Sequence, residues 1–341
     1  LDPVEAIERL QKRLGCLDHF RGRIELQGIR VTRHKRGRRC LVEYDLTLMR
    51  PSGADECLTL VGKARARGLD QRCFRLLIAL RQAGFNENSR DGIAVPEPVA
   101  VVPEFHMWFQ RKVPGVLASD VLSMSRDPRI AQRIADAIHK LQRAGIKPAR
   151  RHTIEDELRL LSQRLATLTA ARPQWRSRLE RVMEACLRLG RDLDGRQLRP
   201  AHRDFYPEQV IVNGERLYLL DFDLYAAADA ALDAGNFIAH ITEETLRRMG
   251  DPDALACHER TIEERFAAVS DYGTRIAVAR YATLTLVRHI YISTCIPHRR
   301  RFTEAILEIC ERRLDISRRL PARDLQLHAG LEGINHANSN A

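Results

Sequence analysis

An Asn-Gly pair between two short apolar runs constrains the middle of this chain more than any other feature. Val210–Val212 precedes Asn213-Gly214, and Leu217–Leu220 follows it. Asn and Gly both tolerate positive φ angles, so the pair predicts a tight hairpin turn between two paired strands. Pairing of these strands brings Gln209 and Asp221, which are distant in sequence, together at the open end of the hairpin.

Carboxylate and amide side chains gather at that open end. Asp204 lies on the segment that leads into the hairpin, and Asp223 follows two residues after Asp221. In such a set one carboxylate can accept the proton of an attacking hydroxyl, while another carboxylate and an amide oxygen can hold Mg²⁺. The joint pattern favours phosphoryl transfer. The alternative is a polar surface hairpin whose Asp residues serve only turns and caps.

The same segment resembles the catalytic core of the aminoglycoside phosphotransferase family, which are small-molecule kinases. The family pattern is His-x-Asp-x-x-x-x-Asn followed by Ile-Asp-x-x. Here His202-Arg203-Asp204 matches the first part and Leu220-Asp221-Phe222-Asp223 matches the second. Asp229 to Asp233, followed by Gly235-Asn236-Phe237, resembles the next family segment. The sequence departs from the pattern at Gln209, which stands where the family has Asn.

The resemblance implies an α+β, protein-kinase-like fold of two lobes, with a small β-rich N-lobe and a larger, mostly helical C-lobe. It is specific at 202–223 and looser elsewhere between about residues 25 and 250. We expect the N-lobe to span 1–111 and to contain an N-terminal helix, a β-meander, a helix and two strands. The C-lobe is expected to span 112–329, with the catalytic hairpin at 201–223, and 330–341 is expected to be a flexible tail.

Apolar periodicity agrees with a strand-rich first third and a helical remainder. The basic residues 33–39 are expected to form the turn between the first two strands, either as a solvated turn or as one whose side chains cover phosphates. Residues 111–115, which contain Pro114-Gly115, resemble the family's hinge between the lobes. Strands are expected at 28–32, 40–48, 58–63, 95–101 and 107–110, and helices at 4–15, 69–81, 120–124, 130–141, 154–168, 174–190, 233–248, 253–270, 273–293 and 302–318.

The family likeness assigns a role to each residue of the candidate site. Asp204 would orient and deprotonate the acceptor hydroxyl, and Asp221 would bind Mg²⁺ together with Gln209, with Asp223 as a further ligand. His202 and Asp233 would brace the catalytic loop from its two sides.

Lys63 is the expected contact to the α- and β-phosphates of ATP. It is one of six Lys in an Arg-rich chain and lies at the end of an apolar strand. An exposed strand-end Lys is the alternative. The usual Glu partner on the next helix is missing, because Arg72 to Gly84 contains no acid. Asp70 is the nearest substitute.

The resulting hypothesis is ATP-dependent transfer of the γ-phosphate to a hydroxyl of a small molecule, such as a sugar, an aminoglycoside-like compound or an amino alcohol. Gln209 moves the amide oxygen by roughly 1 Å relative to Asn, and a misplacement of that size can cost roughly 100-fold in rate. Backbone adjustment, ligation through water or a weak kinase would each account for it. The alternative function is a pseudokinase that binds nucleotide or a protein partner without turnover.

The composition limits the classes of partner and the cellular location that we expect. The formal charge is +11, but Arg is interleaved with Glu and Asp on helical faces, so we expect most of it to be solvated and no nucleic-acid binding. Eight scattered Cys without a Cys-x-x-Cys motif favour a reduced, cytoplasmic setting. No apolar run is long enough to span a membrane, and no signal peptide is expected. The first residue is Leu, which leaves open whether the sequence includes the natural start.

The acidic residues of the helical C-terminal half have two possible interpretations. Glu243 and Glu244, with Asp251 and Asp253 nearby, either line a pocket for a cationic substrate or are solvated helix residues, and the second reading is favoured. The sequence selects neither a particular substrate nor an oligomeric state.

Overall fold

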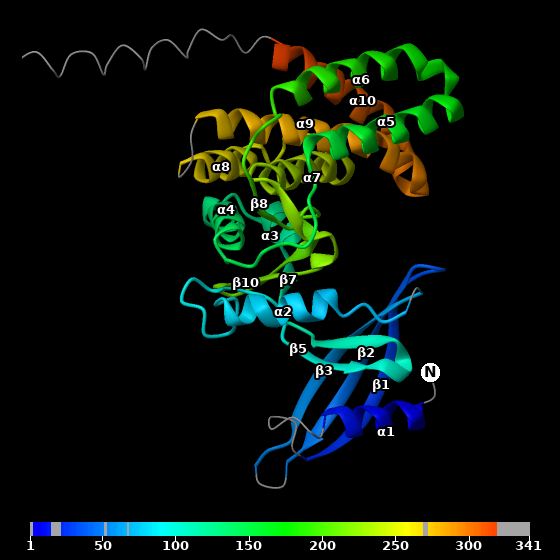
Figure 1. The fold of residues 1–341 in the computed structure, drawn as a ribbon, viewed down its shortest axis with the longest axis vertical. Helices are drawn as coiled ribbons and strands as arrows, with labels where there is room; N and C mark the ends of the chain where they lie inside the picture. The colour runs from blue at the N-terminus through cyan, green and yellow to red at the C-terminus, as the bar shows by residue number, and fades with distance from the viewer. Residues whose placement is uncertain (1–2, 15–21, 51–52, 67, 269–271, 319–341) are drawn as a thin grey trace, which may run out of the picture.

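The computed structural model has a strand-rich N-terminal part and a helical C-terminal part (Figure 1). It describes residues 3–14, 22–50, 53–66, 68–268 and 272–318. This arrangement is the α+β, kinase-like organisation expected from the sequence. The tail expected at 330–341 lies outside the described residues.

Five antiparallel strands form the N-terminal sheet, in the order β1-β2-β3-β6-β5. Alternate side chains of β2, from Val42 to Leu48, are buried on one face, as the two-residue period of a strand requires. Helix α1 (Pro3–Leu14) covers that face through Ala6, Leu10 and Leu14. The strands are β1 (Arg23–Lys35), β2 (Arg39–Met49), β3 (Glu56–Arg65), β5 (Pro98–Val102) and β6 (Met107–Arg111).

The hairpin between β1 and β2 is tighter than expected. Lys35 pairs with Arg39 at the last position of the ladder, so only residues 36–38 form the turn and the rest of 33–39 belongs to strands. Gly37 allows this because its φ of 66° is a left-handed value that glycine adopts without steric cost. The basic side chains of Lys35 and Arg39 therefore project from paired strand ends.

Two other expected elements start later in the structure. Helix α2 (Arg72–Gln82) begins after residue 69, with Gln71 as its N-cap residue. Asp70 lies outside the helix, where its carboxylate accepts the Arg72 N–H at 3.0 Å. The strand expected at 95–101 begins only at Pro98. Pro96, which lacks an N–H group, cannot donate to a ladder there. A 3-10 helix, η2 (Pro103–Phe105), connects β5 to β6.

A second sheet joins the hairpin to the segment that links the two parts of the chain. Its order is β4-β10-β9-β7, with β4 (Ile93–Ala94) parallel to β10 and β9 antiparallel to both β10 and β7. The other strands are β7 (Val116–Leu117), β9 (Val210–Asn213) and β10 (Arg216–Leu219). Gly115 precedes β7 with φ 125°, and a Cβ there would lie 2.3 Å from the Val212 carbonyl oxygen. The Pro-Gly segment therefore needs glycine because it passes directly against the hairpin.

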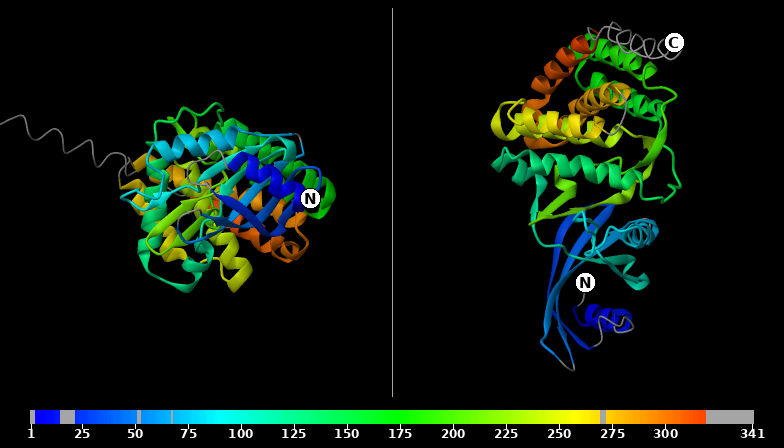
Figure 2. Two further views of the ribbon diagram at one scale, coloured as in Figure 1. Left: turned by 90° about the horizontal axis from the view of Figure 1, so that it is seen from below. Right: turned by 90° about the vertical axis from the view of Figure 1, so that its left-hand side faces the viewer.

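The C-terminal part is built around one buried helix, α7 (Leu232–Met249) (Figures 1 and 2). Gly235 lets α7 approach α9 closely, because a Cβ there would lie 2.7 Å from the Ala282 backbone nitrogen. The other helices are α3 (Ala118–Met124), α4 (Pro128–Gln142), α5 (Ile154–Ala171), η3 (Pro173–Trp175), α6 (Arg176–Arg191), α8 (Ala256–Ala267), α9 (Tyr272–Cys295), η6 (Pro297–Phe302) and α10 (Thr303–Arg318).

One small sheet was not expected from the sequence. Strands β8 (Leu198–Ala201) and β11 (Ala226–Asp229) pair antiparallel on either side of the catalytic segment. Each has four residues, and β11 is rich in Ala, so neither shows the β-branched or aromatic pattern that predicts a strand.

None of the helices in the described ranges is long and apolar enough to cross a membrane. The seven cysteines that the structure describes are all free thiols.

Candidate active site

The predicted hairpin forms, and it places three of the expected site residues at its open end. Val210 pairs with Leu219, and the Leu220 N–H donates to the Gln209 carbonyl at 2.9 Å. Asp221 follows with φ 57° and ψ 63°, a left-handed conformation that is uncommon outside glycine. This conformation ends the strand and starts the 3-10 helix η5 (Phe222–Leu224), which contains Asp223.

The loop that carries Asp204 is fixed by a buried carboxylate and a histidine. Asp233, at the start of α7, accepts the backbone N–H groups of His202 and Arg203 at 2.7 and 2.8 Å. On the other side, His202 Nε2 lies 2.6 Å from the Leu220 carbonyl oxygen, so this nitrogen carries the proton. These contacts confirm the expectation that His202 and Asp233 brace the loop.

A third brace, from Asn236, was not expected. Its side-chain nitrogen donates to the Arg203 carbonyl at 2.9 Å, while its oxygen accepts from Thr285 at 2.8 Å and Arg288 at 2.7 Å. Arg203 itself has a left-handed φ of 70°. A non-glycine residue keeps such a conformation only when its surroundings fix it, and these hydrogen bonds do so.

Asp204 lies partly buried on this loop, within electrostatic reach of Asp221. Burial is the largest influence on its carboxyl group and raises the pKa. The charges of Arg288 and His202 oppose that rise, whereas the negative charge of Asp221 adds to it. A carboxylate with a raised pKa is a stronger proton acceptor than an exposed Asp.

Asp221 and Asp223 face one cation of the N-terminal sheet. The Nη1 atom of Arg39, on β2, lies 3.1 Å from Oδ2 of Asp221 and 3.4 Å from Oδ2 of Asp223. The structure therefore brings both predicted metal-binding carboxylates to a single positively charged group.

Asp223 is held by further partners from the N-terminal part. Arg65, on β3, forms an ion pair with it, and the Cys73 thiol, on α2, donates to its Oδ1 at 3.0 Å. Burial would raise the pKa of Asp223, but these hydrogen bonds and the charges of Arg65 and Lys63 lower it to about 2. Asp223 is thus an ionised link between the sheet, α2 and the hairpin.

Gln209 is buried at the end of the 3-10 helix η4 (Pro207–Gln209). Its amide nitrogen donates to the Tyr206 hydroxyl at 3.0 Å, which leaves the amide oxygen as the atom that can face a cation. Tyr206 in turn stacks on His240, with ring centroids 4.5 Å apart. Gln209 is therefore anchored beside the end of the hairpin, and its role as a metal ligand stays a prediction.

Lys63 lies inside β3, opposite Trp108 of β6, with its Nζ 5.0 Å from the Trp108 ring centroid. The strand continues for two residues past Lys63, so it does not end there as expected. Within the described part of the chain, no carboxylate lies within 4.0 Å of its Nζ. Asp70 does not substitute for the missing Glu, because it pairs with Arg65 and Arg72 instead. The charge of Lys63 still acts on Asp223, so Lys63 faces the site.

A basic pocket of about 460 Å³ lies beside these carboxylates, and its lining residues are Lys35, Gly37, Arg38, Arg39 and Arg65. Burial and the neighbouring Arg charges lower the pKa of Lys35, while the charge of Asp204 opposes the shift, so the pocket borders the catalytic loop. The sequence interpretation included Arg39 only as part of the basic segment 33–39, whose side chains either are solvated or cover phosphates, and it did not name Arg65. Their signal is the strand register, because the two residues are direct partners in the β2–β3 ladder.

The interpretation of Glu243 as a solvated residue is wrong. Its side chain is 3% exposed, and its Oε1 lies 3.4 Å from Nε of Arg247 and 3.5 Å from Nη1 of Arg299. A carboxylate already paired with two guanidinium groups is not free to bind a cationic substrate.

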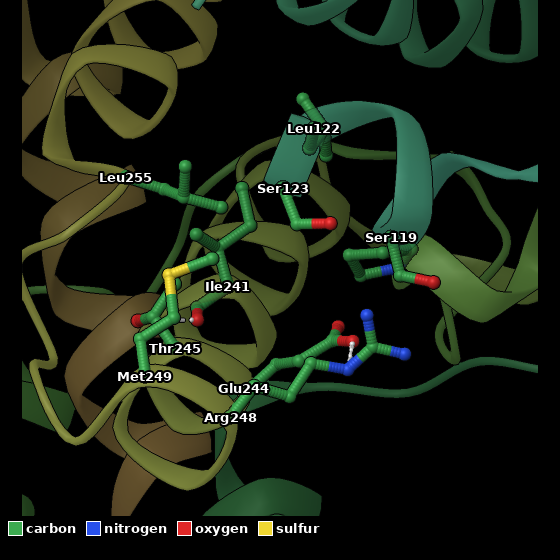
Figure 3. Close-up of a pocket in the computed structure, with 10 residues that line it drawn as sticks. Ser119, Leu122, Ser123, Ile241, Glu244, Thr245, Arg248, Met249 and Leu255 are labelled. Atoms are coloured by element: carbon green, nitrogen blue, oxygen red, sulfur yellow. Dashed lines mark hydrogen bonds and ion pairs between the residues drawn. The ribbon is translucent and has the colours of Figure 1, made fainter. Parts of the chain in front are cut away.

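Glu244 and Arg248 form an ion pair at 2.9 Å in a small pocket between α3 and α7 (Figure 3). Asp251 and Asp253 are exposed, as the favoured interpretation expects. The residues that line the pocket are Ser119, Leu122, Ser123, Pro207, Ile241, Glu244, Thr245, Arg248, Met249 and Leu255.

Solved structures share this fold at low sequence identity. Spectinomycin phosphotransferase in complex with ADP and spectinomycin has a TM-score of 0.59 and 10% identity, over 92% of this chain and 98% of that chain. A choline/ethanolamine kinase family protein from Mesorhizobium loti has a TM-score of 0.55 and 14% identity, over 91% and 94%. Glucosamine kinase in complex with glucosamine, ADP and inorganic phosphate has a TM-score of 0.55 and 18% identity, over 89% and 82%.

The fold, with the braced Asp204 loop beside the Asp221 hairpin, is protein-kinase-like. The sequence model of the phosphotransferase enzyme family matches residues 61–261, which is more than half of the chain. The chain therefore belongs to the phosphotransferase enzyme family. No curated protein has significant sequence similarity to it.

Proposed function

We propose that this chain transfers the γ-phosphate of ATP to a hydroxyl group of a small molecule. Membership of the phosphotransferase enzyme family supports phosphoryl transfer as the reaction class. The observation that carries the proposal is the position of Asp204, which lies on its braced loop within electrostatic reach of Asp221, while Asp221 pairs with Arg39 at 3.1 Å. Catalysis of this reaction consists mainly of positioning the reactants and neutralising charge, which is what such a site offers.

Asp204 is the proposed acceptor of the proton from the attacking hydroxyl. Asp233 and Asn236 hold its loop by three hydrogen bonds to backbone groups, so the carboxylate is positioned before the substrate arrives. Burial raises the pKa of Asp204, and a carboxylate with a raised pKa is a stronger proton acceptor than an exposed Asp.

The basic pocket is the proposed site of the ATP phosphates. Side-chain cations at the tip of the β1–β2 hairpin take the place that backbone amides of a glycine-rich loop have in related kinases. Lys35, Arg39 and Arg65 supply charge from paired strands, and Lys63 supplies it from the middle of β3. Guanidinium groups present several donors in a planar fork that matches phosphate oxygens.

Asp221, Gln209 and Asp223 are the residues that would hold Mg²⁺. One nitrogen of Arg39 already lies within 3.4 Å of both carboxylates, so the two can face a common cation. The described residues contain no group of three or more His, Cys, Asp or Glu that could hold a metal ion. Phosphate oxygens and water would complete the shell of an ion held by Asp221, Gln209 and Asp223. When bound, Mg²⁺ would neutralise negative charge on the phosphates.

The acceptor is a small hydroxyl compound, of the sugar, aminoglycoside-like or amino-alcohol type. Spectinomycin and glucosamine are the compounds bound in two structures of similar fold, and they support this class without selecting a member. The comparisons give no support to the alternative of a pseudokinase. A cytoplasmic location is part of this proposal. ATP is the proposed phosphate donor, and the cysteines that the structure describes are free thiols, as is usual in a reducing compartment.

The test is calorimetric titration of the purified protein with ATP, with and without Mg²⁺. We expect Mg²⁺ to tighten ATP binding, and Asp221→Asn to remove that dependence because it takes away the proposed ligand charge. Asp253→Asn, at an exposed Asp in the same part of the chain, is the matched control and should bind as the wild type does. No ATP binding under either condition would refute the proposal.

A further inference from the structure

Five arginine side chains from separate segments gather behind the loop that carries Asp204. The positive charges of four of them lower the pKa of His289, and the fifth, Arg203, lies within electrostatic reach of Arg288. Helices α5 and α9, which carry two of them, are in contact (Figure 1). We call this set the arginine cluster: Arg164 on α5, Arg203 on the catalytic loop, Arg247 on α7, Arg288 on α9 and Arg299 on η6.

The arginine cluster is joined to the catalytic loop by hydrogen bonds. Arg288 donates to the Asn236 side-chain oxygen at 2.7 Å, and Asn236 donates to the Arg203 carbonyl at 2.9 Å. Arg203 immediately precedes Asp204. A group bound to the cluster would therefore lie next to the proposed proton acceptor.

Carboxylates neutralise only part of the cluster. Glu243 lies 3.4 Å from Arg247 and 3.5 Å from Arg299. Glu157 lies 3.8 Å from Arg288, but its other contact is His152, at 2.7 Å. Two carboxylates thus form ion pairs, within 4.0 Å, with three of the five guanidinium groups.

The other two arginines form no direct ion pair, although the charge of Glu157 acts on both of them. Among the residues that the structure describes, neither Arg164 nor Arg203 has a carboxylate within 4.0 Å of its guanidinium nitrogens. Nη1 of Arg164, Nε of Arg203 and Nε of Arg299 are buried atoms with no hydrogen-bond partner in the same part of the chain. Burial of donors without acceptors is costly, so these nitrogens have unused capacity for an anion.

Two histidines beside the cluster stay neutral. Nε2 of His289 lies 3.3 Å from Nε2 of His240, and Tyr206 of the catalytic loop stacks on His240. Burial and the surrounding Arg charges lower the pKa of His289 to about 3 and that of His240 well below its usual value. Burial, and after it the surrounding positive charge, therefore disfavours protonation of both histidines.

We infer that the arginine cluster binds an anionic group, a phosphate or a carboxylate, on the small-molecule acceptor, and this inference rests on the proposed function. Arg164 and Arg203 provide unpaired guanidinium groups, whose planar donors match phosphate and carboxylate oxygens. The anion would neutralise the excess charge and hold the acceptor hydroxyl toward Asp204. The same charges repel a cationic acceptor, so the cluster also selects against amines.

The test is calorimetry on the full-length protein with its nucleotide site filled by saturating ADP and Mg²⁺. The probes are inorganic sulfate, glucose 6-phosphate, glucuronate, glucose and glucosamine. Sulfate reports the anion site without a sugar, and comparison of glucose 6-phosphate with glucuronate distinguishes a phosphate from a carboxylate. Filling the nucleotide site first prevents the anions from binding in the basic pocket.

Arg164→Gln is the decisive variant, because Arg164 forms no ion pair with a carboxylate among the described residues and its loss breaks none. We expect it to weaken binding of sulfate and of at least one sugar anion about tenfold or more, while glucose and glucosamine bind more weakly than the anions throughout. Arg265→Gln, on the exposed face of α8, is the matched control and should change anion binding by less than about twofold. Unfolding midpoints of both variants show that the fold is kept.

The inference is overturned if the anions do not bind to the wild type, if Arg164→Gln binds them equally well, or if glucosamine binds more tightly than glucose 6-phosphate. In each of these cases ADP binding is intact and the proposed function stands. If ADP with Mg²⁺ fails to bind at all, the proposed function fails and the inference falls with it.

Discussion

Nη1 of Arg39 lies 3.1 Å from Oδ2 of Asp221, although the two residues are 182 positions apart in the sequence. The pair joins the second strand of the N-terminal sheet to the end of the catalytic hairpin. A guanidinium group and Mg²⁺ cannot occupy the same position between Asp221 and Asp223. If Asp221 and Asp223 hold Mg²⁺ as proposed, Arg39 would have to leave these carboxylates, and phosphate oxygens would be its new partners.

Replacing Arg39 with Gln should weaken ATP binding. The variant removes a charge-assisted contact to phosphate, so we expect KM for ATP to rise about tenfold with a smaller change in kcat. Arg30→Gln is the control, because Arg30 is on the neighbouring strand but pairs with Glu43 and Asp45. Steady-state kinetics at saturating Mg²⁺ measures both, and an unchanged KM in Arg39→Gln would contradict the assignment of the basic pocket.

Gln209→Ala should lower kcat about 100-fold and raise the Mg²⁺ concentration needed for half-maximal activity, because it removes a proposed oxygen ligand. Tyr206→Phe removes only the hydroxyl that anchors the Gln209 amide. Its expected effect is a smaller loss of kcat, about threefold to tenfold, through looser placement of the amide. The relevant measurement is activity as a function of Mg²⁺ for both variants. Equal Mg²⁺ requirements in Gln209→Ala and the wild type would exclude Gln209 as a ligand.

Asp233→Asn should destabilise the protein by about 2 to 3 kcal/mol, because an amide cannot accept both buried N–H groups that the carboxylate accepts. Asp233 is 1% exposed, so water cannot replace the lost acceptor. Urea denaturation gives the free energy of unfolding, with the exposed Asp253→Asn as the control. A difference of less than about 0.5 kcal/mol between the two variants would mean that Asp233 does not brace the loop as described.

Glu157 should make stability depend on pH. Burial alone would raise its pKa, but the hydrogen bond from His152 and the charge of Arg288 lower it to about 2 from 4.5. Because the folded pKa is below the unfolded value, this stabilisation is present above the unfolded pKa and is lost as pH falls toward the folded one.

The comparison that isolates this effect is the difference in free energy of unfolding between the wild type and Glu157→Gln. We expect that difference to shrink by about 1 kcal/mol between about pH 6 and about pH 3.5. Urea denaturation at several pH values measures it. A difference that stays constant over this range would show that Glu157 is not an ionised, paired carboxylate in the folded protein.

The parts of the site that sequence predicts well are local or set by turn chemistry. Asn213-Gly214 fixes the hairpin, and the hairpin fixes the neighbourhood of Gln209 and Asp221. The family likeness adds the braces from His202 and Asp233, which the hydrogen bonds confirm. Helices such as α4 and α6 follow from their apolar period because each buries one face, whereas α7 is buried on nearly all sides.

The parts that sequence does not predict depend on how distant segments meet. Arg39 and Arg65 are two of many arginines in the sequence, and only strand register and lobe packing bring them to Asp223. Asp70 looked like a partner for Lys63 by proximity in the chain, but it turns toward Arg65 and Arg72. Glu243 looked solvated on a helical face, yet its neighbours come from η6 as well as from its own helix.

The most direct test of the central claim is transfer of label from ATP with a radioactive γ-phosphate to an acceptor, compared between the wild type and Asp204→Asn. Hydroxyl compounds with neutral, cationic and anionic substituents form the acceptor set. The account predicts a labelled acceptor with the wild type and a loss of about 1,000-fold or more with Asp204→Asn, even though that variant still binds ATP with Mg²⁺. Equal transfer by both proteins, or tight ATP binding without any transfer by the wild type, would contradict it.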